Sequence, residues 1–211
     1  MIKAIVLIGG GGHCASCIEV IESSGLWEIA GIIDTPERIG ERILGYEIIG
    51  SDADIPAFAG RYKNALITVG QIKTATVRVR LFKAVITAGF SYPQIIAGSA
   101  IVSRSASLGR GTIVMHRAFI NAAAKVGDNC IINTGAVVEH DAIVGNNTHV
   151  STGAIVNGGC HVGNECLVGS GSVIRNGIHV ADDVVIGAGA VVIADIAEPG
   201  VYAGCPARKI G

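Results

Sequence analysis

The sequence predicts two joined domains, a small parallel α/β domain followed by a solenoid of short strands. Residues 1–97 alternate buried strand runs with helical stretches, and residues 100–195 repeat every six residues. The 211 residues include 30 glycines but only 4% aromatic side chains. A core with so few aromatic residues must be built from small and branched aliphatic side chains, in short elements joined by tight turns.

The composition argues against several classes of protein. Half of the residues are hydrophobic and 16% are charged, whereas disorder requires low hydrophobicity and high net charge. A net charge of −1 gives no basic field for nucleic acid or an anionic membrane. The uncharged stretch over residues 4–18 is too short and polar to span a bilayer, and its four glycines interrupt any signal-like run. We therefore expect a cytoplasmic protein with no nucleic-acid or membrane partner.

The first domain reads as alternating strands and helices. Its elements are a strand over residues 4–8, a helix over 14–23, a second strand over 29–33, a third over 65–69 and a helix over 74–88. This order predicts a parallel sheet about half the size of a full dinucleotide-binding fold. A short linker, residues 92–97, follows, so the predicted domains are residues 1–97 and 98–211.

The second domain is predicted from sixteen uninterrupted hexads over residues 100–195. The third position of every hexad is Val, Ile or Leu, and the first is Ala, Cys, Ser or Thr in all but two. A period of six fits neither a helix nor simple strand alternation, but it fits short strands that each place one small and one large side chain inward. Three hexads make one triangular coil, so residues 18 apart stack at about 4.8 Å.

A glycine-rich loop joins the first predicted strand to the first predicted helix. Gly10-x-Gly12-x-x-Ala15 would let backbone N–H groups approach a phosphate at a helix N-terminus. Asp34 ends the second strand, where an acid that contacts a ribose or a base would lie. NAD is one possible ligand, but a half-size domain has room for one nucleotide, which favours a nucleotide-diphosphate group.

One histidine of the solenoid stands out because acids flank it. His140 occupies the fifth, outward position of its hexad, between Glu139 and Asp141. A neighbouring carboxylate favours the imidazolium and holds the ring in one tautomer, as a general base requires. The alternative is an ordinary surface histidine in a polar turn.

Other histidines and cysteines give weaker signals. His161 and His179 lie 18 residues apart and should stack, but without a carboxylate companion they predict no metal site. Cys14-x-x-Cys17 could be a redox or metal pair, yet no second such pair completes a zinc site, so we expect structural packing. The three cysteines at inward hexad positions, Cys130, Cys160 and Cys166, should be small buried side chains.

The whole chain resembles one family of enzymes. The hexads are similar to those of hexapeptide-repeat, left-handed β-helix proteins. A GxGGH-type loop joined to such a solenoid, with the NTGAVVEHD segment at residues 133–141 and GVYAGCPAR at residues 200–208, resembles the bacterial PglD/NeuD group. That group contains sugar-nucleotide N-acetyltransferases and sialic-acid O-acetyltransferases.

The resemblance implies a role for particular residues. His140 would be the general base, with Asp141 raising its basicity. The acetyl-CoA contacts would be Asn133, His149, Ser170 and Ala188, with the backbone amide of Gly158 binding the oxyanion. The nucleotide-sugar contacts would be Gly10, Gly11, Gly12, His13, Asp34 and Gly70. Relatives often have two acids where this chain has Asp34-Thr35.

The resemblance further implies a homotrimer with active sites between neighbouring solenoids. The expected reaction is transfer of an acetyl group from acetyl-CoA to the amine of a nucleotide-linked amino sugar, of the UDP-4-amino-sugar type, in surface-glycan or glycoprotein sugar synthesis. Because the cysteines of the solenoid are expected to point inward, nothing suggests an acyl-enzyme, and direct attack of the amine on acetyl-CoA in a ternary complex is the simpler mechanism. The alternatives are a sialic-acid O-acetyltransferase, an NAD-binding dehydrogenase and a non-catalytic scaffold.

Overall fold

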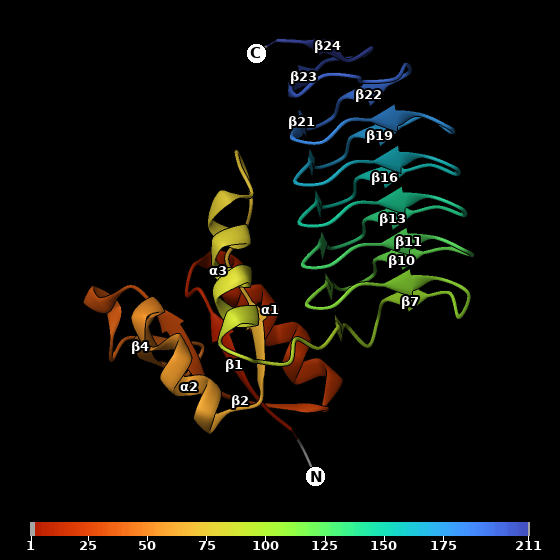
Figure 1. The fold of residues 1–211 in the computed structure, drawn as a ribbon. Coiled ribbons are helices and arrows are strands. Elements are labelled where there is room, and N and C mark those ends of the chain that lie inside the picture. The colour runs from red at the N-terminus through yellow and green to blue at the C-terminus, as the bar shows by residue number, and fades with distance from the viewer. Residues whose placement is uncertain (1–2, 211) are drawn as a thin grey trace. The chain divides into compact units, whose positions relative to one another are not determined.

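The computed structural model describes residues 3–210, which form two compact units (Figure 1). The first unit comprises the residues up to 70 together with 76–98, and the second comprises 71–75 together with the residues from 99 onward. The short segment 71–75 therefore belongs to the second unit, although it lies between two elements of the first in the sequence.

The first unit is a five-stranded sheet with three helices. Its strand order is β3-β4-β2-β1-β5, and all neighbours are parallel except β3 and β4. The elements are β1 (Lys3–Ile8), α1 (Gly12–Ser24), β2 (Trp27–Asp34), β3 (Arg42–Ile43), β4 (Tyr46–Ser51), α2 (Ile55–Arg61), β5 (Asn64–Ile67), α3 (Thr76–Thr87) and the short β6 (Ile95–Ile96), which is not part of the five-stranded sheet. Short 3-10 turns cover Pro36–Arg38 and Asp52–Asp54.

Apolar runs bury this sheet on both faces. Residues 5–8 of β1 are all fully buried, as a strand covered on two sides requires. Val6, Ile8 and Ile67 pack with Leu81 and Val85 of α3 in one core cluster. Because helices cover the faces of the sheet, its polar loops gather at the carboxyl ends of the strands, where ligands bind in open α/β sheets.

The second unit is a β-helix of three sheets, to which successive coils contribute short parallel strands, and the last strand of the third sheet pairs antiparallel with its neighbour. The first sheet holds β7 (Ile101–Val102), β10 (Phe119–Ile120), β13 (Val137–Val138), β16 (Ile155–Val156), β19 (Val173–Ile174) and β22 (Val191–Val192). The second holds β8 (Ser107–Leu108), β11 (Lys125–Val126), β14 (Ile143–Val144), β17 (His161–Val162) and β20 (His179–Val180). The third includes β9 (Ile113–Val114), β12 (Ile131–Ile132), β15 (His149–Val150), β18 (Leu167–Val168), β21 (Val184–Ile186), β23 (Gly200–Ala203) and β24 (Arg208–Lys209).

The six-residue repeat accounts for the packing of this unit. Partners in neighbouring coils are 18 residues apart, as with Val137 opposite Ile155. The inward third positions and the small first positions form one continuous cluster along the axis, which includes the buried Cys130, Cys160 and Cys166. Figure 1 shows the coils stacked from β7 to β22.

The corners of the coils depend on left-handed residues and on a polar ladder. The sixth hexad position adopts a positive φ from Gly111 through Gly189, including Asp141 at 60°. At the corner after the second sheet, side-chain oxygens of Asp128, Asn146, Asn164 and Asp182 each accept a backbone N–H from the preceding coil, at 2.7–2.8 Å. These bonds satisfy turn donors that would otherwise lie without partners.

The predicted fold class, an α/β domain followed by a left-handed β-helix, is confirmed. The sequence reading missed β3, β4 and α2, which fill the gap between the second and third predicted strands. The helix α2 was missed because two of its seven residues, Pro56 and Gly60, have low helix propensity. The strand β4 has only a short apolar pair, Ile48 and Ile49, and it forms because it pairs with β2.

Candidate active site

The glycine loop lies at the carboxyl end of β1, as predicted. Gly9 has φ 108°, and a Cβ atom there would lie 2.2 Å from a side-chain carbon of Val69, so only glycine fits. Gly11 and Gly12 are exposed and have open space around them. Helix α1 begins at Gly12 and has no acidic residue in its first turn. The dipole at this helix N-terminus therefore favours an anionic ligand.

Asp34 holds this loop in place. Its Oδ2 accepts the Gly10 N–H at 2.9 Å and an Arg38 Nη1–H at 2.6 Å, while Oδ1 accepts the Thr35 N–H at 2.8 Å. Arg38 also donates to the Gly10 carbonyl at 2.9 Å. A Cβ atom on Gly10 would lie 2.6 Å from the Asp34 carboxylate, so this glycine is enclosed by the clamp. In this structure Asp34 positions the loop, and Arg38 lies beside it, where its Nε also donates to Glu41 Oε2 at 2.9 Å.

The remaining predicted residues of the first unit lie at the same end of the sheet. Gly70 follows β5, and a Cβ atom on it would touch the His13 side chain at 3.4 Å. Gly10, Gly11, Gly12, His13, Asp34 and Gly70 thus surround the carboxyl ends of β1, β2 and β5.

His140 lies at the corner between the first and second sheets of the β-helix, in the turn from β13 to β14. Its side chain is 57% exposed, and its Nδ1 lies 2.9 Å from Asp141 Oδ2. A carboxylate only accepts hydrogen bonds, so Nδ1 carries the proton and Nε2 presents its lone pair. The hydrogen bond to Asp141 raises the pKa of His140 above its ordinary value.

Glu139 organises the backbone of this turn. Its Oε2 accepts from Asn121 Nδ2 at 2.7 Å, one coil away, and from the His140 N–H at 3.2 Å. The Asn121 bond links two coils beside the histidine. Glu139 thus supports the turn, while Asp141 orients the ring.

Gly158 lies one coil from His140, directly beneath the imidazole. A Cβ atom on Gly158 would lie 2.6 Å from His140 Nε2 and 2.7 Å from Cε1, closer than any real contact. The ring can take this position only because residue 158 is glycine. Among residues 3–210, no acceptor is hydrogen-bonded to the Gly158 N–H. Nε2 and a backbone donor therefore lie together at one corner.

His149 lies in a different environment, on the third sheet. It lines a cavity of about 450 Å³ together with Gln71, Ile72, Ser151, Ser170, Ala188 and outward residues of β18 and β21. Asn133 Nδ2 lies 3.0 Å from His149 Nε2, and Ser151 Oγ lies 2.9 Å from Ser170 Oγ. We call this space the third-sheet cavity. Four of the five residues expected to contact acetyl-CoA, Asn133, His149, Ser170 and Ala188, thus lie in or beside one cavity, and the fifth, Gly158, lies at the His140 corner.

The two predicted parts of the active site lie apart within one chain. His140, Asp141 and Gly158 belong to the corner between the first and second sheets, while the third-sheet cavity lies on the remaining side of the prism. A coil places its histidine corner and its third-sheet strand on different sides, so one chain does not direct His140 Nε2 into its own cavity.

The cysteines give no sign of chemistry. All six are free, and Cys14 and Cys17 are fully buried. Burial raises the pKa of Cys14 to about 11 and that of Cys17 further, so both remain protonated thiols at neutral pH. Within residues 3–210, no group of three His, Cys, Asp or Glu side chains could hold a metal ion. Over the same range, no helix has the length and apolarity needed to cross a bilayer.

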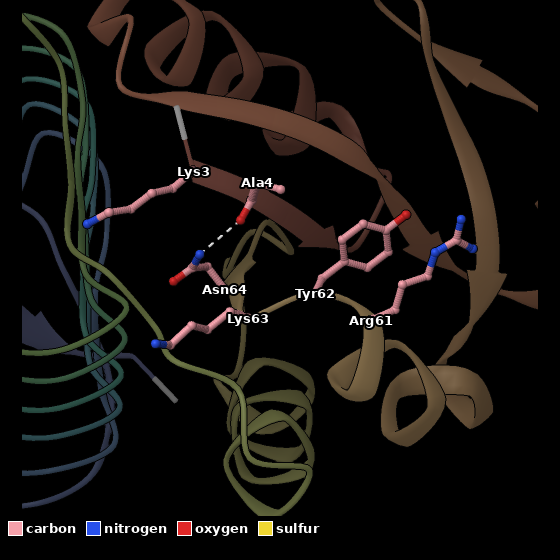
Figure 2. Close-up of a pocket in the computed structure, with 6 residues that line it drawn as sticks. All are labelled: Lys3, Ala4, Arg61, Tyr62, Lys63 and Asn64. Carbon is pink, nitrogen blue, oxygen red and sulfur yellow. Dashed lines mark hydrogen bonds between the residues drawn. The ribbon is translucent and has the colours of Figure 1, made fainter. Parts of the chain in front are cut away.

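A second concave region lies at the amino ends of β1 and β5. This cavity of about 340 Å³ is lined by Lys3, Ala4, Arg61, Tyr62, Lys63 and Asn64. Figure 2 shows Lys3 and Lys63 extending to one side and Tyr62 and Arg61 to the other, so the three cations do not converge. It lies at the opposite ends of these strands from the glycine loop, and none of the predicted site residues lines it.

Sequence reasoning missed two residues that shape the sites. Arg38 stands four residues after Asp34 and completes the clamp on Gly10, and its spacing from that acid was an available signal. Gln71 directly follows Gly70 and contacts His149 through its backbone carbonyl. No local pattern pointed to Gln71, because its partner lies 78 residues away.

Comparisons with known proteins found family models that match each of the two parts of the chain. Residues 4–85 match the PglD N-terminal domain, and residues 160–194 match the hexapeptide repeat of succinyl-transferase. A comparison with the curated proteins found no match.

Solved structures match over the full chain. One is a histidine-to-asparagine variant of perosamine N-acetyltransferase from Caulobacter crescentus, in complex with CoA and GDP-perosamine. It is 32% identical with a TM-score of 0.93, and the match covers 100% of this chain and 98% of that one. The acetyltransferase domain of PglB from Neisseria gonorrhoeae is 29% identical with a TM-score of 0.90, over 99% and 100% of the two chains. The chain therefore belongs to the PglD-like family of hexapeptide-repeat acyltransferases.

Proposed function

We propose that this enzyme transfers an acetyl group from acetyl-CoA to the amine of a nucleotide-linked amino sugar. The observation that carries the proposal is the His140 corner, where an oriented imidazole presents Nε2 beside the backbone N–H of Gly158. The full-length likeness to a perosamine N-acetyltransferase crystallised with CoA and GDP-perosamine supports the same substrate classes.

The chemistry follows from the orientation of His140. The sugar amine attacks the thioester carbonyl carbon, and Nε2 takes the proton that the nitrogen loses as the C–N bond forms. The Gly158 N–H stabilises the oxyanion of the tetrahedral intermediate. When the intermediate collapses, the C–S bond breaks, and the CoA sulfur leaves and takes the proton from the imidazolium. Asp141 accepts from Nδ1 throughout and stabilises the charged ring.

The first unit would hold the nucleotide-diphosphate part of the substrate. Gly11, Gly12 and the start of α1 would offer N–H donors to the phosphates, while the Gly10 N–H is held by Asp34 and Arg38 lies beside this loop. His13, Asp34 and Gly70 complete the same end of the sheet. The third-sheet cavity, with Asn133, His149, Ser170 and Ala188, would hold part of acetyl-CoA.

We further propose a homotrimer in which the base of one chain faces the cavity of the next. Along the first sheet, the outward second hexad positions form an unbroken apolar row that continues from coil to coil: Ile101, Phe119, Val137, Ile155, Val173 and Val191. The corresponding row of the second sheet includes Lys125, His161 and His179. A continuous apolar face of this kind favours association, and it runs beside the His140 corner.

Light scattering tests the assembly. The wild type should give three times the mass of one chain, and Ile155→Glu, which places a charge in the apolar row, should lower that mass. A monomeric wild-type enzyme with full activity would contradict the trimer.

The reaction is tested by mass spectrometry of the products formed from acetyl-CoA with UDP-linked 4-amino sugars, with GDP-linked 4-amino sugars and with a free sialic acid, each in a separate reaction. NAD binding is measured in a further, separate titration. We expect an N-acetylated nucleotide sugar. Acetylation of the sialic acid alone, or saturable NAD binding without acetyl transfer, would overturn the proposal.

The six free thiols fit a reducing compartment, and we propose a cytoplasmic location.

Gly10→Ala tests the role of the first unit. A methyl group at residue 10 meets the Asp34 carboxylate, so the variant should lose nucleotide-sugar affinity and keep acetyl-CoA binding in calorimetric titrations. Gly60→Ala is the matched control, because residue 60 lies in α2 with open space around it. Equal affinity of the wild type and Gly10→Ala for the nucleotide sugar would show that the loop does not bind this substrate.

A further inference from the structure

Residues 71–75, which we call the strap, belong to the β-helix unit, and Gln71 is the first of them. The Gln71 residue is only 3% exposed. Its Nε2 donates to the backbone carbonyl of Cys166 at 3.0 Å and contacts that of Glu165 at 3.4 Å. The side chain therefore fastens the start of the strap to the turn that precedes β18.

The backbone of the same residue fixes the imidazole of His149. The Gln71 carbonyl lies 2.8 Å from His149 Nδ1, and a carbonyl can only accept, so Nδ1 carries the proton. Nε2 then accepts from Asn133 Nδ2 at 3.0 Å. The Asn133 amide is oriented in turn, because its Oδ1 accepts the Thr134 N–H at 2.8 Å. These bonds select one tautomer and one ring plane for His149, a residue that is 8% exposed.

The position of Gln71 points to more than packing. Its Oε1 is buried and has no hydrogen-bond partner among residues 3–210. A buried acceptor without a partner lowers stability, so an apolar residue of the same shape would suit the fold at least as well. Gln71 and His149 both line the third-sheet cavity. The side-chain amide of Gln71 thus lies where it can fix the orientation of His149 in the wall of this cavity.

We propose that Gln71 is a positioning residue that acts through His149. Its side chain fastens the strap, its carbonyl holds the Nδ1–H tautomer, and the oriented imidazole forms one wall of the third-sheet cavity. The link to catalysis rests on the proposed function, in which this cavity takes part of acetyl-CoA. The link to the tautomer stands without it.

The first test measures the tautomer in ligand-free protein. Two-bond ¹H–¹⁵N spectra of the histidine rings should show a single Nδ1–H form for His149, assigned by its loss in His149→Ala. Gln71→Met keeps the volume but removes the amide, and we expect a mixture that includes the Nε2–H form. Ile72→Ala is the matched control, because residue 72 lies in the same strap and cavity but is 78% exposed, and it should leave the tautomer unchanged.

The second test measures the consequence for the reaction. Gln71→Met should raise KM for acetyl-CoA by about 5- to 30-fold, with a smaller change in kcat and none in KM for the nucleotide sugar. A thermal melt should show no loss of stability, which separates positioning from a structural role. If Gln71→Met does not fold, Gln71→Asn, whose shorter amide does not reach the Cys166 carbonyl, takes its place in both tests.

The outcomes separate the two proposals. An unchanged His149 tautomer in the residue 71 variant would overturn the positioning role, whatever the kinetics. A changed tautomer in a protein that binds no acetyl-CoA would leave the positioning of His149 intact and overturn the proposed function.

Discussion

Two histidines nine residues apart in one coil show how differently the β-helix treats the same side chain. His140 lies on an exposed corner, where its Nδ1 is hydrogen-bonded to Asp141 and its Nε2 is presented outward. His149 is buried on the third sheet, and both of its ring nitrogens contact other residues. An imidazole must have an accessible nitrogen to move a proton, whereas one bound at both nitrogens can only shape a surface. The comparison supports the proposal that His140 transfers the proton and that His149 forms a wall of the cavity.

The largest expected effect comes from removing His140, the proposed base. His140→Ala should lower kcat by about 10² to 10⁴, the usual contribution of a general base, while acetyl-CoA binding stays nearly unchanged. His161→Ala, which removes an exposed histidine of the second sheet, should have no such effect. Steady-state kinetics together with calorimetry checks both variants. Wild-type turnover in His140→Ala would leave the corner without a catalytic role and favour a scaffold.

Displacing the ring rather than removing it should have a smaller effect. Gly158→Ala puts a methyl group within 2.6 Å of the present position of His140 Nε2, so the imidazole must move away from the backbone donor. We expect kcat to fall by about 10- to 100-fold, since a displacement of about 1 Å has costs of this size. Asn176→Ala, an exposed residue of the same column in the next coil, is the control. Equal kcat values would show that the stacking of ring on glycine is incidental.

The pH dependence should reveal the role of Asp141. His140 acts as a base only when it is unprotonated, so kcat/KM falls as the pH drops through its pKa, which the Asp141 hydrogen bond raises. Asp141→Asn should lower that pKa, move the acidic limb of the profile to lower pH and reduce the plateau rate.

Asp183→Asn is the matched control for this pH experiment. Residue 183 has the same left-handed backbone, with φ 57° against 60° for residue 141, and asparagine tolerates that conformation. If the acidic limb of the pH profile does not move in Asp141→Asn, then a group other than His140 determines the pH at which kcat/KM falls.

Local and periodic features could be predicted from the sequence. The hexads predicted the β-helix because the small and the large inward residues recur in every six-residue repeat. Gly158 was expected only from the family resemblance, and in the structure it lies one coil from His140. The glycine loop and the EHD turn were recognisable as local sequence patterns. Features that depend on distant partners were not: β4 forms by pairing with β2, and Gln71 meets His149 across 78 residues. Asp34 was expected to contact ligand, but its loop-holding bonds to Gly10 and Arg38 follow only from the fold.

The central claim is that a complete site needs the His140 corner of one chain and the third-sheet cavity of another. Subunit mixing tests it most directly. His140→Ala chains are mixed, by unfolding and refolding together, with chains whose cavity is filled by Ala188→Trp, each variant being inactive alone. In a 1:1 mixture half of the corners and half of the cavities are intact, so about one quarter of the wild-type activity should return if each site joins two chains. Native mass spectrometry verifies that hybrid assemblies form, and hybrid assemblies without any recovered activity would contradict the shared site.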